Sequence, residues 1–456
     1  MSRTPSGVDS AGVDHRDPEL RLQAFFDRGT LRLLAPRDDS GVLHARGRVG
    51  GTPAVAFATD ATRMGGALGL DGCRHIVSAI DTAVRDRVPV AGLWHSGGAR
   101  VTEGVAALDG VGQVFAAAVR ASGRVPQLSV VLGPAAGGAA YGPALTDIVI
   151  MSRSGRIFVT GPEANHDVTG DRVVHLTAED DGAALGEARR LVVLLGHQGR
   201  FSPDDVPPGG RTGQSLDTLV PAGTRAYDVQ PLVRALLDEP GVELHGGWAP
   251  NLVTTLGRFA GRTVGVVANN ALRLGGCLDA SAAEKAARFV RMCDSLGVPL
   301  IVLVDVPGYL PGVDQEWDGV VRRGTQLLHA FAGAVVPRVT LVTRRAYGGA
   351  YIAMNSRSLG ATAVFAWPAA EIAVMGPSAA VDMVHRKRLA AAPLADRDAL
   401  REQLIREQIA EAGGVRRALE TGVVDAVIEP AETRRRIAEA LAAAPAGRGW
   451  HGNIPL

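Results

Sequence analysis

Two glycine-rich segments of the chain could do chemistry with backbone amides rather than with side chains. The first reads AAGGAAYGPA from Ala135 to Ala144, and the second reads AYGGAYIAMN from Ala346 to Asn355. Each follows an apolar run that predicts a strand and opens a run that predicts a helix. Peptide N–H groups at a helix start lack intrahelical acceptors, and the dipole there is positive. Because glycine lets a ligand approach the backbone closely, each segment could hold an oxygen that gains negative charge.

Either segment could instead be a tight strand-to-helix turn in which only small residues fit. Two copies in the same setting favour function over packing alone. Two such turns suggest a reaction in which two carbonyl-like oxygens gain charge, and a thioester enolate and a ureido oxygen are natural candidates.

An internal repeat places the two segments at equivalent positions. The stretch GRVGGTPAVAF begins at Gly47 and GRFAGRTVGVV begins at Gly257, an offset of 210 residues (257 − 47). Other landmarks keep this register, and Gly137 and Gly348 are 211 residues apart (348 − 137). The chain therefore consists of two related halves. The segment 196–217, rich in proline and glycine, predicts the join between them.

Each half repeats one order of predicted elements. A hairpin comes first (42–49 with 53–59, then 252–260 with 262–269), followed by a Gly-Gly turn and a helix (73–86, then 281–297). Two apolar strands follow, at 88–94 and 125–133 in the first half and at 298–304 and 336–343 in the second. Ser281 and Glu284 have capping-box spacing and predict the start of the second helix at that serine. Alternating strands and helices predict an α/β fold, with an N-terminal domain at 19–217 and a C-terminal domain at 218–456.

The composition is that of an ordinary globular protein. The 456 residues are 46% hydrophobic and 21% charged, with a formal net charge of +1. This balance indicates neither nucleic acid nor a membrane as a partner, and no apolar run approaches the ~18 residues of a membrane span. The three cysteines, Cys73, Cys277 and Cys293, form no CxxC pair, which argues against a zinc or redox motif and predicts a cytoplasmic protein. The polar N-terminus predicts a disordered leader over residues 1–18, not a signal peptide.

Six long motifs resemble the carboxyltransferase (β) subunits of biotin-dependent acyl-CoA carboxylases of the propionyl-CoA/acetyl-CoA type. They span 95–104 (HSGGARVTEG), 133–147, 277–294, 304–324, 344–356 and 366–377. The terminal HGNIPL is also similar to this family, and the resemblance runs from about residue 20 to the end. It implies that each half is a crotonase-like spiral of β-β-α units.

The resemblance also implies the roles of residues. Gly137 and Gly138 would hold the thioester enolate oxygen, and Gly349 and Ala350 the ureido oxygen of biotin. The remaining expected site residues are those that bind substrate (Gly97, Gly98, Ala99, Arg100, Ala136, Tyr347 and Ile352) and those that bind the cofactor (Gly308, Gly348 and Gly349).

By the same resemblance, carboxybiotin releases CO₂ in the site, its ureido nitrogen takes the α-proton of the acyl-CoA, and the enolate attacks CO₂. Preorganised backbone donors then suffice, and no metal is expected. The chain has only two lysines, Lys285 and Lys387, and neither lies in the Met-Lys-Met turn that carries biotin. Biotin is therefore expected on a separate biotin carboxylase/biotin carboxyl carrier subunit. The family further implies a homo-hexamer, a dimer of trimers, in which the N-terminal half of one subunit faces the C-terminal half of another.

Several residues depart from the family pattern or allow two interpretations. His95 and His75 replace residues usual in relatives, and the loop after Gly170 is shortened. Arg100 could meet a phosphate of coenzyme A or brace its turn, whereas Asp305 and Asp314 are predicted to lie in loops and turns on the biotin side. Isoleucine at 352, where propionyl-directed relatives carry an acidic residue, indicates acetyl-CoA or a broader acyl range, although it could serve helix packing alone.

Two alternatives to the carboxylase interpretation remain at this point. One is a biotin-dependent decarboxylase of malonyl-type thioesters, which would use the same site in reverse. The other is a non-catalytic structural partner of a related carboxyltransferase subunit, suggested by the shortened loop and the histidine replacements.

Overall fold

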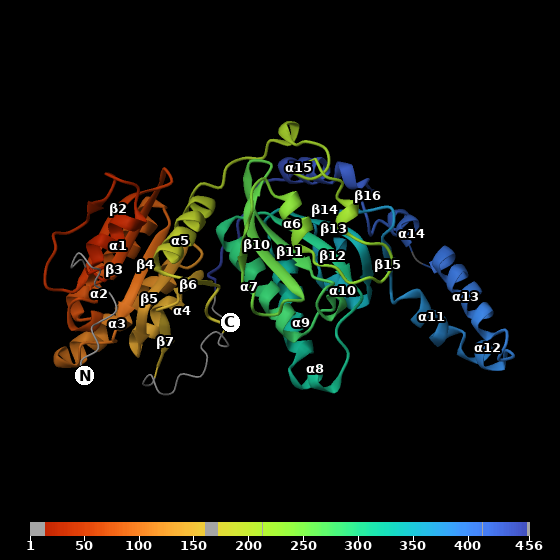
Figure 1. Ribbon diagram of the computed structural model, residues 1–456, viewed down its shortest axis with the longest axis horizontal. Coiled ribbons are helices and arrows are strands. Elements are labelled where there is room, and N and C mark those ends of the chain that lie inside the picture. Colours follow the sequence, from red (N-terminus) through yellow and green to blue (C-terminus); the bar gives the residue numbers. More distant parts are fainter. Residues whose placement is uncertain (1–13, 160–171, 212, 413, 454–456) are drawn as a thin grey trace. The chain divides into compact units, whose positions relative to one another are not determined.

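The sequence repeat appears as two sheets of the same design in the computed structural model, which describes residues 14–159, 172–211, 213–412 and 414–453. The described residues up to Gln198 and from Gly449 onward form one compact unit, and Gly199–Arg448 form the other (Figure 1). The units divide inside the predicted joining segment, and the last described residues belong to the first unit. The predicted leader lies largely outside the described residues. Gly170, after which the loop was expected to be shortened, and the last three residues of HGNIPL also lie outside them.

The first sheet is built from β1 (Arg32–Leu33), β2 (Val42–Val49), β3 (Thr52–Thr59), β4 (Val90–Ser96), β5 (Gln127–Ala136), β6 (Ile148–Ser152), β7 (Arg156–Phe158) and β8 (Leu176–Ala178). The second is built from β9 (Val242–Leu244), β10 (Leu252–Phe259), β11 (Arg262–Asn269), β12 (Leu300–Val306), β13 (Arg338–Tyr347), β14 (Ala363–Ala366), β15 (Glu371–Ala373) and β16 (Ala426–Val427).

The two sheets have corresponding strand orders. The first runs β1-β2-β3-β4-β5-β6-β8, with β7 paired to β5, and the second runs β9-β10-β11-β12-β13-β14-β16, with β15 paired to β13. In each sheet an antiparallel hairpin, β2–β3 or β10–β11, is followed by parallel strands. Parallel strands need crossover connections, and helices supply them here. The predicted α/β fold with two homologous halves is confirmed.

The first unit contains the helices α1 (Pro18–Phe25), α2 (Leu70–Asp86), α3 (Val105–Ala121), α4 (Gly138–Ala144) and α5 (Asp181–Gly196). The second contains α6 (Gln230–Leu236), α7 (Ala280–Leu296), α8 (Val313–Trp317), α9 (Val320–Gly333), α10 (Gly348–Ala353), α11 (Pro377–Val384), α12 (Arg386–Ala391), α13 (Arg397–Ala412), α14 (Gly414–Glu420) and α15 (Thr433–Ala443). The chain from α11 to α13 leads away from the second sheet (blue in Figure 1). Among the described residues, no helix is long and apolar enough to cross a membrane.

The first long helix of each half ends in the same way. Arg87 after α2 and Gly297 after α7 both adopt the left-handed conformation, with φ of 56° and 71°, which terminates a helix by redirecting the chain. The predicted start of α7 was wrong, because the helix begins at Ala280 and Asp279 caps it by accepting from the Ala282 N–H at 2.8 Å. An aspartate side chain satisfies the first amides as a serine would.

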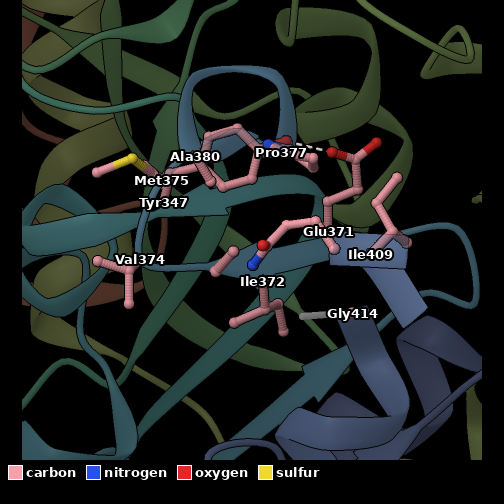
Figure 2. Close-up of a pocket in the computed structure, with 11 residues that line it drawn as sticks. Tyr347, Glu371, Ile372, Val374, Met375, Pro377, Ala380, Ile409 and Gly414 are labelled. Atoms are coloured by element: carbon pink, nitrogen blue, oxygen red, sulfur yellow. Dashed lines mark hydrogen bonds between the residues drawn. The ribbon is translucent and has the colours of Figure 1, made fainter. Parts of the chain in front are cut away.

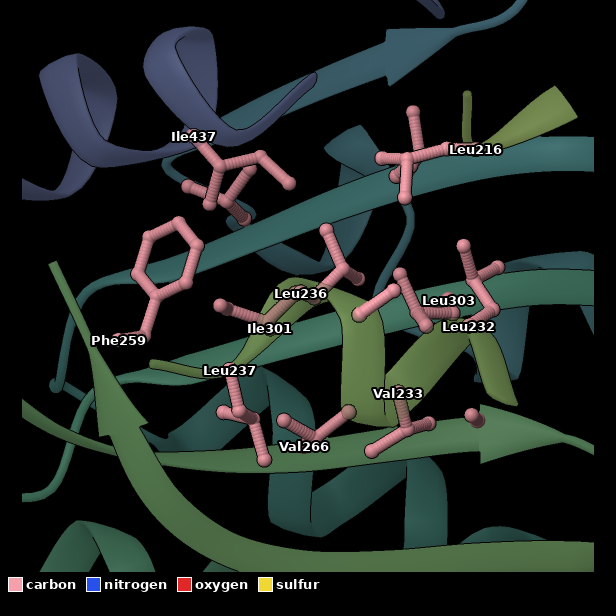
Figure 3. Close-up of a cluster of buried hydrophobic side chains, with 14 of the residues drawn as sticks. Leu216, Leu232, Val233, Leu236, Leu237, Phe259, Val266, Ile301, Leu303 and Ile437 are labelled. Carbon is pink, nitrogen blue, oxygen red and sulfur yellow. The ribbon is translucent and has the colours of Figure 1, made fainter. Parts of the chain in front are cut away.

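A continuous apolar core fixes the second sheet against its covering helices. Leu232 and Leu236 of α6 pack with Ile301 of β12, and all three are fully buried (Figure 3). Ile437 of α15 belongs to the same cluster. Burying one such side chain contributes roughly 1.5–3 kcal/mol, so this cluster holds in place the strands that lead to the second Gly-Gly-Ala turn.

Candidate active site

The first Gly-Gly-Ala turn follows β5 and precedes α4. Gly137 has φ of 56° and ψ of −126°, a positive-φ conformation that glycine adopts without strain. Its N–H donates to the Phe158 carbonyl on β7 at 3.0 Å. Gly137 was expected to donate to the enolate oxygen, but this amide is already engaged. Gly138 and Ala139, the first two residues of α4, are the amides at this turn that have no intrahelical acceptor.

The second turn lies at the end of β13 and also contains a glycine with positive φ. Gly348 has φ of 59°, and a side chain there would place its Cβ 2.9 Å from the Val374 carbonyl oxygen. Gly349 and Ala350 follow in α10, in the places that Gly138 and Ala139 take in the first turn. The two pairs therefore occupy the same register of the repeat. Because α4 and α10 have only seven and six residues, individual amides rather than a long helix dipole would provide the stabilisation.

Gly349 is not required by packing. It is exposed, its φ lies outside the left-handed region, and a Cβ built on it would meet no atom within 4 Å. A Cβ on Gly138, in contrast, would lie 3.1 Å from the Val111 side chain. Open space in front of a backbone amide is what a ligand oxygen needs to approach it.

A second loop, which contains Gly97 and Gly98, lies beside the first turn. The Gly98 carbonyl accepts from Leu68 N–H at 2.8 Å, and a Cβ on Gly98 would lie 3.1 Å from the Ala136 carbonyl. In the second half, Gly308 makes the equivalent bond with Leu278 N–H at 3.1 Å. The structure thus brings Gly97, Gly98 and Ala136 together with the first Gly-Gly-Ala turn.

Arg100 braces this loop. Its Nε donates to the Ala67 carbonyl at 3.0 Å, Nη2 donates to the Ser40 carbonyl at 2.8 Å, and Nη1 pairs with Glu103 at 3.2 Å. All three guanidinium nitrogens are engaged within the protein. This arrangement favours the bracing role over contact with a phosphate of coenzyme A.

His95 lies on β4 with its ring against Gly133, whose added Cβ would fall 2.3 Å from Nδ1. The buried Arg21 of α1 places Nη2 3.4 Å from the same Nδ1. Burial, and next the positive charge of Arg21, lowers the pKa of His95 to about 4. A neutral imidazole that accepts from arginine at Nδ1 is suited to positioning rather than to donating a proton near pH 7.

Asp305 takes the position of His95 in the second half (305 − 95 = 210). It is buried on β12, and its carboxylate pairs with Arg344 at 2.7 Å and with Arg345 at 2.8 Å. The prediction that Asp305 and Asp314 lie in loops and turns was wrong, because Asp305 belongs to a strand and Asp314 to the first turn of α8. Both carboxylate oxygens are therefore engaged by guanidinium groups of the protein, so Asp305 holds Arg344 and Arg345 in place.

His75 and Lys285 also correspond across the repeat (285 − 75 = 210). Lys285 is 1% exposed, and its Nζ donates to four backbone carbonyls, including Leu252 at 2.6 Å and Trp248 at 2.8 Å. His75 contacts Asp38 through Nε2 at 3.1 Å and His44 through Nδ1 at 3.0 Å. Each of the two side chains ties the helix after the Gly-Gly turn to the segment before the hairpin, so each has a structural role.

A pocket adjoins the second turn (Figure 2). Its walls include Tyr347, Ile372, Val374 and Ile409, and it encloses about 510 Å³, part of it open to solvent. The Tyr347 hydroxyl donates to the Glu371 carboxylate at its edge. Burial, and next the hydrogen bond to Glu371, raises the pKa of Tyr347 above its usual range. Sequence reasoning missed this Tyr–Glu pair, since the two residues are 24 apart and no motif joins them.

No group of three or more histidine, cysteine, aspartate or glutamate side chains in the described parts of the chain could hold a metal ion. Ile352 is 44% exposed on α10, so its side chain is available to a ligand beside Gly349 and Ala350.

The chain matches the model of the carboxyl transferase domain over residues 22–448. It is 58% identical to the beta6 subunit of a biotin-dependent acetyl-/propionyl-coenzyme A carboxylase of Mycobacterium tuberculosis, a match covering 97% of this chain and 98% of the relative. It is 54% identical to a propionyl-CoA carboxylase beta chain of Rhodococcus erythropolis over 99% of both chains.

Solved structures agree with these relatives. The transcarboxylase 12S structure, a hexamer described with methylmalonyl-coenzyme A and methylmalonic acid bound, superposes with a TM-score of 0.87. It is 38% identical, and the match covers 96% of this chain and 92% of that one. A single-chain, multi-domain long-chain acyl-CoA carboxylase has a TM-score of 0.78 at 27% identity, covering 93% of this chain and 46% of that one. These neighbours confirm the crotonase-like carboxyltransferase fold.

Proposed function

The chain belongs to the carboxyl transferase domain family, and on that premise we propose that it is the carboxyltransferase subunit of a biotin-dependent acyl-CoA carboxylase. It moves a carboxyl group between biotin on a separate subunit and the α-carbon of a short acyl-CoA. One observation carries this proposal: two pairs of backbone amides, Gly138 with Ala139 and Gly349 with Ala350, occupy the same register of the repeat, each directly after a glycine with positive φ.

The two turns have separate tasks in this proposal. The amides of Gly138 and Ala139 hold the thioester oxygen as the α-carbon loses its proton and charge moves onto that oxygen. The amides of Gly349 and Ala350 hold the ureido oxygen of biotin. Removing one donor from a site of this kind costs roughly 3–4 kcal/mol of barrier. Carboxybiotin, when bound, supplies the carboxyl group and a basic nitrogen.

The ionisable side chains near the turns keep the geometry rather than move protons. Arg100 braces the loop beside the first turn, and His95 is held neutral by burial and Arg21. Asp305 forms ion pairs with both Arg344 and Arg345 near the end of β13. Rigid side-chain contacts of this kind hold the backbone donors in position before the reaction begins. Donors that need no rearrangement lower the activation barrier.

Ile352 lies two residues beyond Ala350 and is half-exposed. We assign it to the acyl range of the enzyme, with acetyl-CoA or a broad set of short acyl-CoA thioesters as substrates. An apolar side chain at this position lacks the charge that the resemblance associates with propionyl-directed members.

The proposal requires partners. A biotin carboxylase/biotin carboxyl carrier subunit delivers carboxybiotin, and the chain assembles as a homo-hexamer in which the first half of one copy faces the second half of another. The hexamer of the transcarboxylase 12S structure, 38% identical to this chain, supports the assembly.

Reconstitution with the matching biotinylated subunit, ATP, Mg²⁺ and labelled bicarbonate tests the proposal. We expect label in a carboxylated product of acetyl-CoA or another short acyl-CoA. Loss of CO₂ from malonyl-type thioesters without any fixation would favour a decarboxylase, and no turnover in either direction despite stable assembly would favour a non-catalytic partner.

A further inference from the structure

Three arginines gather on one face of the first sheet. Arg32 of β1 lies directly opposite Arg46 of β2 in antiparallel register. Arg48 is two residues further along β2, so its side chain points to the same face. All three are exposed, and they line one open hollow together with Asp86 at the end of α2.

The hollow has an excess of positive charge. Asp86 is the acidic side chain in its lining, and its carboxylate already accepts from Arg85 Nε at 3.0 Å. Like charges directly opposite one another across a ladder destabilise a sheet by up to roughly 1 kcal/mol. Backbone carbonyls accept hydrogen bonds from two of the three arginines. Arg48 donates to the Gly51 carbonyl at 2.7 Å, and Arg32 donates to the Gly29 carbonyl at 3.2 Å.

The other half of the chain shows that the fold does not need arginines here. Val242 and Leu256 stand 210 residues after Arg32 and Arg46 and pair in the same antiparallel register. They are 3% and 0% exposed. One ladder position of the repeat is therefore apolar and buried in the second unit but charged and exposed in the first. A folding requirement common to both units cannot account for the arginine pair.

The arginine surface lies away from the catalytic turn. Val88, in its lining, leads into β4, whose opposite end runs into Gly97 and Gly98. The seven residues of β4 separate the two places by roughly 20 Å at ~3.3 Å per residue. A ligand of the arginines would thus be distinct from the reacting part of the acyl-CoA.

We propose that Arg32, Arg46 and Arg48 dock an acidic polypeptide segment of the biotin-carrying partner subunit. This proposal rests on the proposed function, which requires such a partner. Arg46 and Arg48 are about 7 Å apart along the strand, and Arg32 and Arg46 about 5 Å across it. Carboxylates at alternate positions of an extended segment, or one turn apart on a helix, match these spacings. Guanidinium groups bind carboxylates in pairs of parallel hydrogen bonds.

Binding of a fluorescein-labelled peptide of ten glutamates to the full chain, followed by fluorescence anisotropy, tests the proposal without any turnover. We expect the peptide to bind at low salt and the variant with Arg32→Gln and Arg46→Gln to bind at least tenfold more weakly. The matched control, with Arg74→Gln and Arg120→Gln, removes two other exposed arginines of the first unit and should bind like the unaltered chain. Equal binding by both variants would overturn the proposal.

Three further measurements distinguish an acidic segment from other ligands of the hollow. Displacement of the peptide by stoichiometric coenzyme A would make the hollow a nucleotide site, and preference for a short DNA duplex would make it a nucleic-acid site. A change of oligomeric mass in the Arg32/Arg46 variant would assign the surface to contacts between copies of this chain. Each of these results overturns the proposal. In the reconstituted enzyme, the same variant should raise the KM for the biotinylated subunit at least tenfold.

Discussion

Gly137 and Gly348 both have positive φ angles, 56° and 59°, at the ends of β5 and β13. Each lies directly before a glycine and an alanine at the start of a short helix. The repeat therefore keeps a glycine with positive φ at this turn in both halves, while the side chains around the turn differ. That relationship is what an enzyme needs if two oxygens are to be held by amides in similar ways.

Replacing Gly349 with alanine should separate function from folding. A Cβ there meets no atom of the protein, and alanine stabilises a helix relative to glycine by up to ~1 kcal/mol. We expect an unchanged or higher Tm together with at least a tenfold loss of kcat, because the methyl group occupies the space in front of the amide. Steady-state kinetics and thermal unfolding measure both effects.

The matched control for that variant is Gly186→Ala in α5, where an added Cβ also meets nothing within 4 Å. It should show the same effect on Tm and no effect on kcat. If Gly349→Ala retained full activity, the open space at that turn would have no role in the reaction.

The two glycines with positive φ should differ in their tolerance of alanine. Gly348→Ala combines a left-handed alanine, which costs roughly 1–2 kcal/mol, with a Cβ 2.9 Å from the Val374 carbonyl. Gly137→Ala also places an alanine at positive φ, but its Cβ would meet no atom within 4 Å. Urea unfolding should therefore show the larger destabilisation for Gly348→Ala. Two variants as stable as the unaltered chain would disprove the strained geometry.

His95 should make stability fall on acidification. Its pKa in the folded chain is about 4, below the ordinary 6.5, so the unfolded chain binds more protons between these values. The contribution of neutral His95 to the free energy of unfolding is complete above about pH 6.5 and is lost as the pH falls toward 4. Between pH 7 and pH 5 the loss from His95 amounts to about 2 kcal/mol.

Urea unfolding of the His95→Gln variant at both pH values checks this expectation. The variant should lose about 2 kcal/mol less than the unaltered chain over this interval. Some acid sensitivity will remain, because burial and the charge of His75 also lower the pKa of His44 to about 4. Identical losses in the variant and the unaltered chain would mean that His95 is not held neutral.

The acyl range should respond to Ile352. Replacing this half-exposed side chain with aspartate should raise the ratio of kcat/KM for propionyl-CoA over acetyl-CoA by about tenfold, an effect of the size that single pocket contacts produce. Ile352→Val keeps the apolar character and serves as the control. If the ratio of the two kcat/KM values did not change in the aspartate variant, Ile352 would serve packing alone.

The sequence was sufficient to predict the elements that follow local rules. The hairpins, the parallel strands and the equivalence of the Gly-Gly-Ala turns all follow from apolar patterns and glycine positions, which act over a few residues. The cap of α7 was misplaced by two residues, because aspartate and serine both cap helices and both occur there.

Contacts between distant residues could not be predicted in this way. Arg21 contacts His95, although the two residues are 74 positions apart in the sequence. Arg344 contacts Asp305, which is 39 positions away. No local pattern reports such pairs. The engaged amide of Gly137 belongs to the same class, because its acceptor, Phe158, joins β5 only through the pairing of β7. The pair of amides left for an oxyanion therefore shifts by one residue, to Gly138 and Ala139.

The most direct test of the central claim needs only this chain and free biotin. Purified protein is mixed with malonyl-CoA or methylmalonyl-CoA, and the release of acetyl-CoA or propionyl-CoA is followed with and without biotin. We predict release that depends on biotin and that Gly349→Ala reduces at least tenfold. A folded, assembled protein that converts neither thioester at any biotin concentration would contradict the account.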